Sequence, residues 1–599
     1  MQARGAARLA VDIGGTFTDI ALEIGAHRIT TKVLTTSRAP EDGVLAGISK
    51  VLDEGGIAPA DIGIIIHGTT LATNALIERK GAKTALVVTE GFRDSVEMAY
   101  ENRFEQYDVN VDRPRPLVPR YLRLPVRERL TAAGEALVAL DEQSVRDLVP
   151  ILRENAIESI ALGLIHSYAN PAHEQRVAEI LREELPGVPV SLSCEVCPEI
   201  REYERQSTTC ANAYVQPLIG RYLTRLDAQL RERGFVCPFF LMTSGGGLTT
   251  LDTAVRFPIR LVESGPAGGA ILASRIATEL GLEEVLSYDM GGTTAKICLI
   301  DGMTPLKSRT FEVDRVYRFK RGSGLPVRIP VIEMVEIGAG GGSIAHVDAM
   351  QRINVGPHSA GSQPGPACYG HGGSEPTVTD ADVMMGRIDP ARFADGAVAL
   401  DLDAAAGAVA GKVGEPLGLT APLAAFGICE IVDENMANAA RVHAIEWGKD
   451  VARRTMIAFG GAAPLHAARL AETLGLDTVI VPTGAGVGSA IGFLQAPIAY
   501  EVVRSRYMRL SAFSPALANE ALDAMRAEAD AVVRLGAPAE GLIETRQAFM
   551  RYAGQGHEIS VDVPVRAIVA DDAGALKEAF EAAYTALYGR IIPHLDIEI

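Results

Sequence analysis

Two short segments of this 599-residue chain repeat one pattern, and the repeat limits the possible folds more than any other feature. Residues 11–22 read VDIGGTFTDIAL and residues 288–299 read YDMGGTTAKICL. Aligned without gaps, the copies share an aspartate, two glycines, a threonine, an isoleucine and a leucine. Each copy predicts a strand, a tight turn at the glycine pair and a second strand, because paired glycines adopt turn conformations that other residues avoid.

The two predicted hairpins carry groups suited to binding a phosphate. Glycines leave backbone N–H groups open to an anion, and the threonine hydroxyl adds a donor. The aspartate that ends the first strand would repel the same phosphate, and a hydrated Mg²⁺ or Mn²⁺ between them would remove this conflict. One such turn can simply join two strands, whereas two copies favour a two-lobed nucleotide-binding protein that holds the β- and γ-phosphates from both sides. The residues concerned are Asp12, Gly14, Gly15 and Thr16, and in the second copy Asp289, Gly291, Gly292 and Thr293.

Other nucleotide-binding motifs do not fit the sequence. No G-x-x-x-x-G-K-[ST] segment occurs, so the chain is not a P-loop protein. GAGGGS at 338–343 has dinucleotide-like glycine spacing, but the strand-like IAHVD follows it instead of the helix that a Rossmann motif needs. A third glycine turn, at Gly460, Gly461 and Ala462, joins a buried strand to a helix. We assign this turn to the adenosine moiety, with plain strand–helix packing as the alternative.

The pattern of apolar residues predicts an α/β protein. Strand-like and helix-like segments alternate over residues 8–100 and resume after an irregular, proline-rich stretch at 101–125. Residues 301–380 are rich in strand-like runs and glycine, which predicts a β-rich insertion. The sequence stops at LDIEI, an apolar, strand-like run without a polar tail, so we expect the native chain to continue beyond residue 599.

Charge and composition exclude several classes of partner. The formal net charge of −18, without a basic run, argues against binding to nucleic acid or to an anionic membrane surface. No stretch reaches the ~18 apolar residues of a bilayer span, and no signal-peptide core precedes Asp12, so we expect a cytoplasmic protein. The seven scattered cysteines are typical of reduced thiols rather than of disulfides.

With its two phosphate hairpins and its adenosine turn, the chain resembles the sugar kinase, heat-shock protein and actin superfamily. Within that superfamily it is most similar to the hydantoinase A / 5-oxoprolinase family, over residues 9 to about 590. The segments that carry this resemblance are LAVDIGGTFTDIAL, HGTTLATNALIERKGAKTALVVTEGFRD, VESGPAGGA, YDMGGTTAK, IGAGGGSIAHVD, GPACYG, EPTVTDADVMMGR and FGGAAPLHAARLAE.

The resemblance implies an actin-like, two-lobed ATPase fold made of duplicated ribonuclease H-like domains, with inserted β-rich segments. We expect an N-terminal lobe at 1–200 and a second lobe at 201–495, which carries the β-rich insertion at about 301–380. A C-terminal α/β region, truncated at its end, is expected at 496–599.

The resemblance also implies an enzyme subunit that uses ATP, with Mg²⁺ or Mn²⁺, to phosphorylate a carbonyl substrate. It would act in a hetero-oligomer beside a hydantoinase B-type partner chain. The expected substrate is a small cyclic amide that is opened by hydrolysis. The alternative is a ketone that is carboxylated, through a phosphorylated enolate or bicarbonate, as in acetone and acetophenone carboxylases. A non-catalytic actin-like scaffold is a third interpretation, which the intact aspartates of both hairpins disfavour.

The resemblance assigns roles to the residues of the two hairpins. Asp12 and Asp289 would hold the metal ion through water, and Asp12 or Asp19 would orient or deprotonate the nucleophile. Lys296 stands where the first copy has Asp19, and it would either steady the phosphate charge or point into solvent. The residues expected to contact the phosphates are Asp12, Gly14, Gly15, Thr16, Thr18, Asp289, Gly291, Gly292, Thr293 and Thr294.

Three further segments are expected near the site. His67, Thr69 and Thr70 end a predicted strand before a helix and are assigned to the nucleotide site, with Asn74 beside them; a hydrogen-bonded strand end is the alternative for His67. The segment 264–269 begins a helix with Ser264 as its N-cap, and the resemblance places it in the cleft. The segment 338–343, with His346, would form part of the substrate pocket or a turn that supports the β-rich region.

The remaining histidines and cysteines do not form a recognisable metal site. Cys194 and Cys197 make one CxxC pair, but no second pair stands at zinc-binding spacing. His466 is expected to pack or to contact the base, and His557 is expected to be structural. A cluster without zinc-like spacing comprises His358, Cys368, His371, Asp380 and Asp382.

Overall fold

The structure is a computed structural model, and it describes residues 7–36, 39–100, 103–317, 321–396, 398–539 and 541–599. The chain forms two compact units, each assembled from separate stretches of sequence. Unit 1 comprises Met1–Ala75, Ile219–Thr310 and Pro330–Ala499, and unit 2 comprises Leu76–Leu218, Phe311–Ile329 and Tyr500–Ile599. The predicted consecutive regions 1–200, 201–495 and 496–599 stay a prediction.

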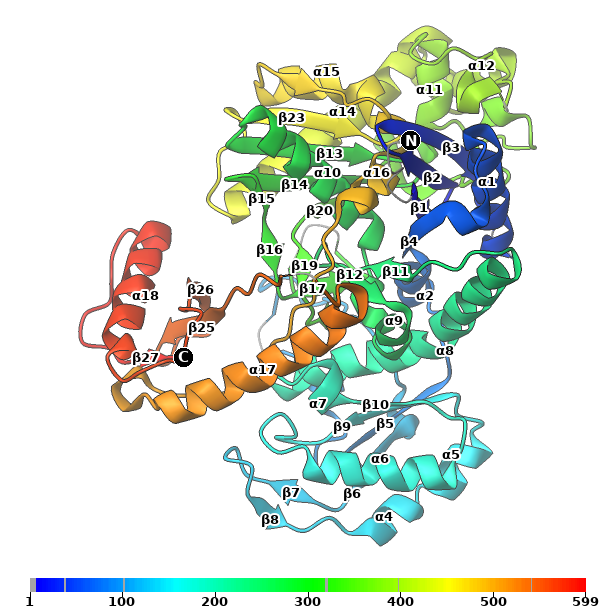
Figure 1. The fold of residues 1–599 in the computed structure, drawn as a ribbon. Helices are drawn as coiled ribbons and strands as arrows, with labels where there is room; N and C mark the ends of the chain where they lie inside the picture. Colours follow the sequence, from blue (N-terminus) through cyan, green and yellow to red (C-terminus); the bar gives the residue numbers. More distant parts are fainter. Residues whose placement is uncertain (1–6, 37–38, 101–102, 318–320, 397, 540) are drawn as a thin grey trace, which may run out of the picture. The chain divides into compact units, whose positions relative to one another are not determined.

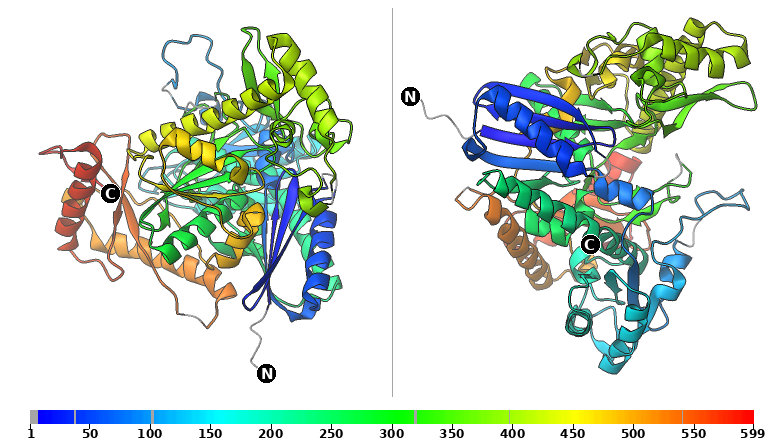
Figure 2. Two further views of the ribbon diagram at one scale, coloured as in Figure 1. Left: turned by 90° about the horizontal axis from the view of Figure 1, so that it is seen from above. Right: turned by 90° about the vertical axis from the view of Figure 1, so that its right-hand side faces the viewer.

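Unit 1 contains a six-stranded sheet in the order β12-β11-β4-β1-β2-β3 (Figure 1). Strands β1, β2 and β3 form an antiparallel meander, while β4 runs parallel to β1 and β11 runs parallel to β4. Helix α1 (Pro40–Gly55) lies across one face of the sheet at β2 and β3 (Figure 2, right). The strands are β1 (Ala7–Ile13), β2 (Phe17–Ile24), β3 (His27–Leu34), β4 (Ile62–Thr69), β11 (Phe239–Met242) and β12 (Leu248–Thr250).

A second sheet of unit 1 has the order β15-β14-β13-β23-β24, with β20 also paired to β14. Its strands are β13 (Glu284–Met290), β14 (Ala295–Asp301), β15 (Thr304–Pro305), β20 (Val335–Ile337), β23 (Thr455–Phe459) and β24 (Val479–Ile480). The order β20-β14-β13-β23-β24 repeats β3-β2-β1-β4-β11 of the first sheet, strand direction included. This repeat is the duplicated core, and the predicted α/β, actin-like fold is confirmed.

Two helices pack against each other between the sheets (Figure 1). Helix α10 (Ser264–Leu280) contacts β13, and α16 (Gly488–Gln495) contacts β1 and β2. The helix backbones touch, because a Cβ added to Gly492 would lie 1.9 Å from the Gly268 carbonyl oxygen. A buried apolar cluster that includes Ala267 and Phe493 surrounds this crossing. The glycine crossing therefore fixes the spacing between the two sheets.

Helices α14 (Ala421–Glu446) and α15 (Ala463–Leu474) cover the second sheet, and α11 (Val378–Met384) and α12 (Leu402–Val409) pack beside α14. The apolar core here joins Val432 and Met436 of α14 to Tyr288 of β13. No single helix in the described part of the chain has both the length and the apolar composition of a membrane span. The segments Leu402–Leu417 and Ala421–Glu446 pass that test only as a pair, which is bent by 88°.

The predicted β-rich insertion at about 301–380 contains β15 to β22. Within unit 1, β21 and β22 form a hairpin, and β16 pairs with β19. In unit 2, β17 pairs with β18. The strands not yet introduced are β16 (Lys307–Ser308), β17 (Phe311–Val313), β18 (Leu325–Val327), β19 (Val331–Ile332), β21 (Ser343–Val347) and β22 (Ile353–Ser359).

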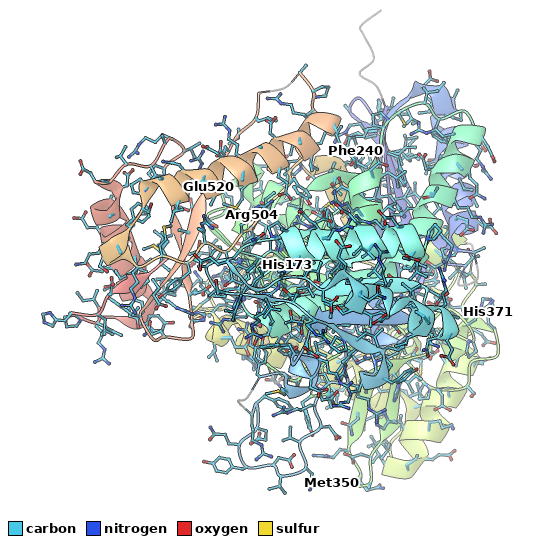
Figure 3. The ribbon with its side chains drawn as sticks, turned by 90° about the horizontal axis from the view of Figure 1, so that it is seen from below. His173, Phe240, Met350, His371, Arg504 and Glu520 are labelled. Atoms are coloured by element: carbon cyan, nitrogen blue, oxygen red, sulfur yellow. The ribbon has the colours of Figure 1, made fainter. Side chains whose placement is uncertain are left out.

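Unit 2 has its own sheet of four parallel strands, in the order β10-β9-β5-β6. His173 lies on α6 (Figure 3), and its Nδ1 is 2.9 Å from the buried Glu128 carboxylate. The strands are β5 (Thr84–Thr89), β6 (Arg123–Val126), β9 (Ser159–Gly163) and β10 (Val190–Leu192), and β7 (Arg129–Leu130) pairs with β8 (Ala136–Val138). The helices are α3 (Ser95–Met98), α4 (Glu142–Arg146), α5 (Val149–Glu154), α6 (Ala172–Glu184) and α7 (Ser193–Val196).

Two helices, α2 (Leu71–Ile77) and α8 (Glu202–Glu232), have residues in both units. Helix α9 (Leu251–Arg256) follows β12 in unit 1. The C-terminal part of unit 2 combines α17 (Pro515–Gly536) and α18 (Asp572–Tyr588) with three short strands. Glu520 lies on α17, and Arg504, which precedes this helix in the chain, pairs with Glu528 of α17 at 2.6 Å (Figure 3). Tyr552, Phe580 and Tyr584 form the buried aromatic core of this part. The strands are β25 (Gln547–Tyr552), β26 (Ile559–Asp562) and β27 (Ile597–Glu598).

Candidate functional site

The tips of the two glycine hairpins touch each other within unit 1. Thr16 Oγ1 and Thr293 Oγ1 are 3.2 Å apart. A Cβ added to Gly292 would lie 2.9 Å from Thr16 Oγ1, and one added to Gly15 would lie 3.4 Å from Thr293 Oγ1. Each second glycine therefore faces the threonine of the other hairpin, so the repeated sequence produces a nearly symmetric contact.

The turns of both hairpins are closed in the same way. The Gly14 N–H donates to the Phe17 carbonyl at 2.9 Å, and the Gly291 N–H donates to the Thr294 carbonyl at 3.0 Å. Thr18 is buried beneath the first turn, where its hydroxyl is 3.1 Å from that of Thr35. Thr35 in turn donates to the Gly14 carbonyl. Thr18 thus supports the turn through Thr35, a residue that was not among the predicted site residues.

Asp12 is buried where β1 ends, against two glycines. A Cβ on Gly265 would lie 3.0 Å from the Asp12 carboxylate, and one on Gly68 would lie 3.3 Å from it. Asp12 Oδ1 has no hydrogen-bond partner among the described residues. Burial, with repulsion from Asp19 and Asp289, raises the pKa of Asp12 to about 7. Asp12 is therefore a carboxylate poised to change protonation state near neutral pH.

Asp289 holds the corresponding place in the second sheet. Burial raises its pKa to about 6, although Lys296 and a hydrogen bond with Ser489 of α16 oppose the rise. The third glycine turn lies directly beside it, since a Cβ on Gly460 would be 2.4 Å from Asp289 Oδ1. Gly460 has a φ of +96°, so this position needs glycine for its backbone as well.

The rest of the third turn is anchored to the second hairpin. The Ala462 N–H donates to the Met290 carbonyl at 2.9 Å. A Cβ on Gly461 would meet nothing within 4 Å, so this residue leaves open space beside the turn. The structure therefore brings the predicted adenosine turn to the predicted phosphate hairpin, and the adenosine assignment itself stays a prediction.

Asp19 and Lys32 form a close ion pair in the first sheet. They stand opposite each other on β2 and β3, and Asp19 stands opposite Asp12. Burial raises the pKa of Asp19, and Lys32 counteracts that rise. Lys32 was not among the predicted site residues, because only the pairing of β3 with β2 brings it to Asp19.

Lys296 does not point into solvent, which was one of its two interpretations. Its side chain is 16% exposed, and its ammonium lies 3.5 Å from Glu336 and 3.9 Å from Glu263. Burial alone would lower the pKa of Lys296, but Glu336, Glu263 and the two hairpin aspartates outweigh it and raise the pKa. Burial, then Glu336, raises the pKa of Glu263 to about 7, against the effect of Lys296. Neither glutamate was predicted to belong to the site.

Thr69 and Thr70 lie at the end of β4, beside the first hairpin. Thr70 Oγ1 donates to the Ile13 carbonyl at 3.2 Å. The Thr69 N–H donates to Ser264 Oγ at 3.1 Å, which joins β4 to the start of α10. Ser264 is the first residue of α10 and not its N-cap, a position that Glu263 occupies in a left-handed conformation. The correction follows from Ser264 Oγ, which bonds to Thr69 and not to the N–H groups of its own helix.

Both ring nitrogens of His67, which lies inside the first sheet, have hydrogen-bond partners. Its Nδ1 lies 3.2 Å from the Val11 carbonyl, and its Nε2 lies 3.0 Å from the Tyr222 hydroxyl. Burial lowers the pKa of His67 to about 4, so the ring is neutral, with one nitrogen donating and the other accepting. This geometry favours the structural alternative for His67.

The segment 338–343 packs on the back of the second hairpin. The Gly341 N–H donates to the Gly291 carbonyl at 3.0 Å, and the Gly342 N–H donates to the Gly292 carbonyl. A Cβ on Gly340 would lie 2.6 Å from the Thr293 backbone. This segment therefore supports the hairpin, whereas His346 lies exposed on β21.

Asp380 and Asp382, from the segment without zinc-like spacing, take part in two separate hydrogen-bond groups. Asp380 accepts hydrogen bonds from the Cys368 and Thr377 N–H groups as a helix cap. Asp382 and Asp433 contact Nε2 and Nδ1 of the buried His466 at 3.1 and 2.8 Å. Burial alone would lower the pKa of His466, but these two carboxylates outweigh it and raise the pKa to about 9. All seven cysteines are buried, and none of them forms a disulfide.

The hairpin aspartates fit a hydrated divalent cation. Among the described residues, no three His, Cys, Asp or Glu side chains are placed to hold a metal ion directly. Mg²⁺ usually keeps several waters and takes one or two carboxylates together with substrate phosphates. Asp12 and Asp289 supply that donor set, and the unpartnered Asp12 Oδ1 leaves one oxygen available for it.

Comparison with known proteins assigns this chain to a family. The model described as hydantoinase/oxoprolinase matches residues 205–502, and the model of the hydantoinase/oxoprolinase N-terminal region matches residues 8–185. The chain belongs to the hydantoinase/oxoprolinase family. The predicted family is therefore confirmed, and with it the prediction of an enzyme subunit, at the level of the family.

Individual members of the hydantoinase/oxoprolinase family match almost the whole chain. Caprolactamase subunit alpha of Pseudomonas jessenii is 36% identical over 99% of this chain and 85% of its own length. The acetophenone carboxylase gamma subunit of Aromatoleum aromaticum is 32% identical over 97% of this chain and 82% of its own length.

Solved structures of two relatives have the same fold. The crystal structure of the ATP-dependent caprolactamase from P. jessenii matches with a TM-score of 0.81 and 34% identity, covering 99% of this chain and 86% of that one. Nucleotide-free acetone carboxylase matches with a TM-score of 0.78 and 27% identity, covering 99% and 87%. The relatives include a caprolactamase and carboxylases, so the comparisons leave the reaction of this chain open.

Proposed function

We propose that the chain is the ATP-dependent subunit of an enzyme that phosphorylates the carbonyl oxygen of a cyclic amide and so drives ring opening. A hydantoinase B-type partner would contribute to the later step, in a hetero-oligomer. The observation that carries the proposal is the meeting of two phosphate-type hairpins, each with an aspartate near the end of its first strand, in a chain similar to an ATP-dependent caprolactamase.

In this proposal the hairpin backbones and hydroxyls bind the phosphates of ATP. The oxygen of the amide attacks the γ-phosphorus, the bond from phosphorus to the β–γ bridging oxygen breaks, and ADP leaves. Asp12 takes the proton that the amide nitrogen loses, because a pKa of about 7 lets one carboxylate accept a proton and release it again. Asp19 is held by Lys32 and is the weaker candidate for this base.

Asp12 and Asp289 would hold Mg²⁺ or Mn²⁺ through water, and the ion would screen the charge of the phosphates. The phosphorylated carbonyl is then open to water. One water opens the ring at the C–N bond, and a second releases phosphate, so amide, ATP and two waters give the amino acid, ADP and phosphate.

A carboxylase is the second candidate. The observation in its favour is the 32% identity to an acetophenone carboxylase subunit over nearly the full chain. The first step would be the same in kind, with an enolate or bicarbonate oxygen as the acceptor. We place the hydrolase first because identity to caprolactamase is higher and extends over 99% of the chain.

The two candidates predict different cosubstrates and products. ADP formation is measured with 5-oxoproline, hydantoin, caprolactam, acetone and acetophenone, each with and without bicarbonate and the partner chain, and the products are identified by mass spectrometry. Lactam-dependent ADP and a ring-opened amino acid without bicarbonate are expected. Turnover confined to ketones in the presence of bicarbonate, with a keto acid as product, would replace the hydrolase by the carboxylase.

Asp289→Asn tests the assignment of the site in either case. The variant is expected to lower ADP formation by about 100-fold or more, because a carboxylate of the proposed phosphate site is lost. Asp53→Asn, which removes an exposed carboxylate from α1, is the matched control and should behave as wild type. Equal activity of both variants would refute the site.

A further inference from the structure

The two sheets present the same kind of charged ladder, with the lysine on a different strand. In the first sheet Asp12, Asp19 and Lys32 stand opposite one another on β1, β2 and β3. In the second sheet the corresponding places on β13, β14 and β20 hold Asp289, Lys296 and Glu336. Residues directly opposite in antiparallel strands share one face of a sheet. The duplication has thus kept two acids and one base in each ladder but has moved the base beside the hairpin aspartate of the second sheet.

The ammonium groups of the two lysines differ in how closely they are paired with carboxylates. Lys32 makes a close ion pair with Asp19, and its ammonium lies 5.1 Å from the centre of the Phe17 ring. An ammonium group carries three hydrogen-bond donors. The hydrogen bond that the structure gives Lys296 runs to Thr294 Oγ1 at 3.1 Å. Its carboxylate neighbours lie at 3.5 and 3.9 Å, beyond the 2.7–2.9 Å usual for a charged hydrogen bond.

Lys296 also interacts with the hairpins of both sheets. The carboxylates that act on its charge include Asp289 from its own sheet and Asp12 from the other. Its hydrogen-bond partner Thr294 closes the second glycine turn. The ammonium lies between Thr294 of the second hairpin and Glu263, which stands two residues before the glycine that contacts Asp12 of the first. It has donors left over in the place where the phosphates of a nucleotide are expected.

Glu263 is held facing Lys296 at a conformational cost. Its φ of 60° and ψ of 26° are left-handed, a region that side chains other than glycine rarely adopt outside turns and functional sites. The side chain is 8% exposed. The Glu263 N–H donates to Thr73 Oγ1 at 3.3 Å, which fixes the backbone at the start of α10. A buried acid in this conformation is explained if it positions the amine of Lys296.

We propose that Lys296 is a catalytic residue that binds the γ-phosphoryl group during transfer, with Glu263 and Glu336 as the positioning residues that keep its ammonium between the hairpins. This inference rests on the proposed function and assigns the second hairpin a part that the first lacks. Lys296 forms no covalent bond and keeps its proton. It donates to the non-bridging oxygens of the phosphoryl group, on which negative charge is spread as the bond to ADP breaks.

Lys296→Met tests the assignment in the full chain. Wild-type protein is first shown to bind MgADP, and to bind it more tightly in the presence of aluminium fluoride, which mimics the phosphoryl group in the transition state of transfer. The variant is expected to lower kcat for ADP formation by about 100-fold or more. Its Kd for MgADP should stay within about threefold of wild type, while Kd for the fluoroaluminate complex rises by about 30-fold or more, because the ammonium is required only at the transferred group.

Three comparisons make the test decisive. Lys449→Met removes a lysine that pairs with Asp301 at the far end of β14, and it should match wild type in every measurement. Where Lys296→Met does not fold, Lys296→Arg takes its place, with a fall in kcat of about tenfold at unchanged melting temperature expected. A kcat within threefold of wild type, or equal weakening of both complexes, would overturn the role of Lys296.

The positioning role is tested by a double-mutant cycle. Glu263→Gln should lower kcat in the wild-type background and have little further effect in Lys296→Met, because it acts through the ammonium. Equal losses in both backgrounds would show that Glu263 acts separately. Wild-type protein that bound no nucleotide would refute the proposed function together with this inference, whereas normal nucleotide binding with an inert Lys296 would refute the inference alone.

Discussion

Asp12 combines a proposed catalytic role with a cost to the stability of the folded chain. Its carboxylate is buried, and one of its oxygens lacks a hydrogen-bond partner among the described residues. Gly68 and Gly265 approach it so closely that larger residues would displace it. A buried, unpaired charge destabilises the folded chain, so a residue kept in this state is typical of a functional site.

Replacing Asp12 by Asn should therefore abolish ADP formation and stabilise the nucleotide-free protein. The pKa is 3.8 in the unfolded chain and about 7 in the folded one, so folding favours the protonated acid. Wild-type stability should fall as the pH rises from about 4 to 7, and the advantage of the variant should grow over the same range by up to about 4 kcal/mol. Urea unfolding of both proteins at pH 5 and pH 8 measures this difference.

The activity of the wild type should have the opposite dependence. An ionised Asp12 is needed to accept a proton, so kcat/KM should rise with pH through about 7. Asp53→Asn serves again as the exposed control, with the wild-type profile expected. A variant Asp12→Asn that was less stable than wild type at pH 8 would contradict the view of Asp12 as an unpaired buried charge.

At the scale of elements, the site depends on the glycine crossing of α10 and α16. Gly268 and Gly269 of α10 were expected in the cleft, but an added Cβ would meet Phe493 at the first and Phe459 at the second. These two glycines serve packing, while Ser264 and Gly265 at the start of the same helix reach Thr69 and Asp12. One helix thus links the spacing of the sheets to the position of the carboxylate proposed as the catalytic base.

Gly492→Ala is expected to destabilise the chain strongly. Its Cβ would lie 1.9 Å from the Gly268 carbonyl oxygen, so the helices must separate, at about 2–3 kcal/mol or more. Gly407→Ala in α12 is the matched control, because its Cβ would meet nothing within 4 Å, and alanine should stabilise that helix by up to about 1 kcal/mol. Chemical unfolding of both variants measures the contrast, and similar values for the two would show that the crossing tolerates a methyl group.

The local elements of the site could be predicted from the sequence, and the long-range pairings could not. The turns at Gly14 and Gly291 are indicated by the residues next to them in the sequence. The predicted strands and turns of both hairpins therefore agree with the structure. Lys296 was recognised as a departure from the repeat, but its neighbour Glu336 lies on β20, and nothing local indicates which strand pairs with β14. Glu263 was within a quoted motif, yet its left-handed backbone depends on contacts made only in the folded chain.

At the scale of the whole chain, the residues of the candidate site all come from unit 1. Both hairpins, the third glycine turn and the two lysines lie in its three sequence segments. Phosphoryl transfer as proposed needs no residue from a partner chain. In the proposed function, much of the later attack of water on the phosphorylated carbonyl belongs to the hydantoinase B-type partner that the family resemblance implies.

The two steps should therefore separate when the chain is studied alone. With ATP carrying ¹⁸O in the β–γ bridge, reversible transfer to a lactam lets the released β-phosphate rotate and return, so the label moves into non-bridging positions. We expect lactam-dependent scrambling by this chain without partner, with ring-opened product formed at a substantial rate only when the partner chain is added. Nuclear magnetic resonance of ³¹P follows the label, and Asp289→Asn should show no scrambling. Ring opening at full rate without partner, or scrambling that requires it, would mean that the two steps are not divided between the chains as proposed.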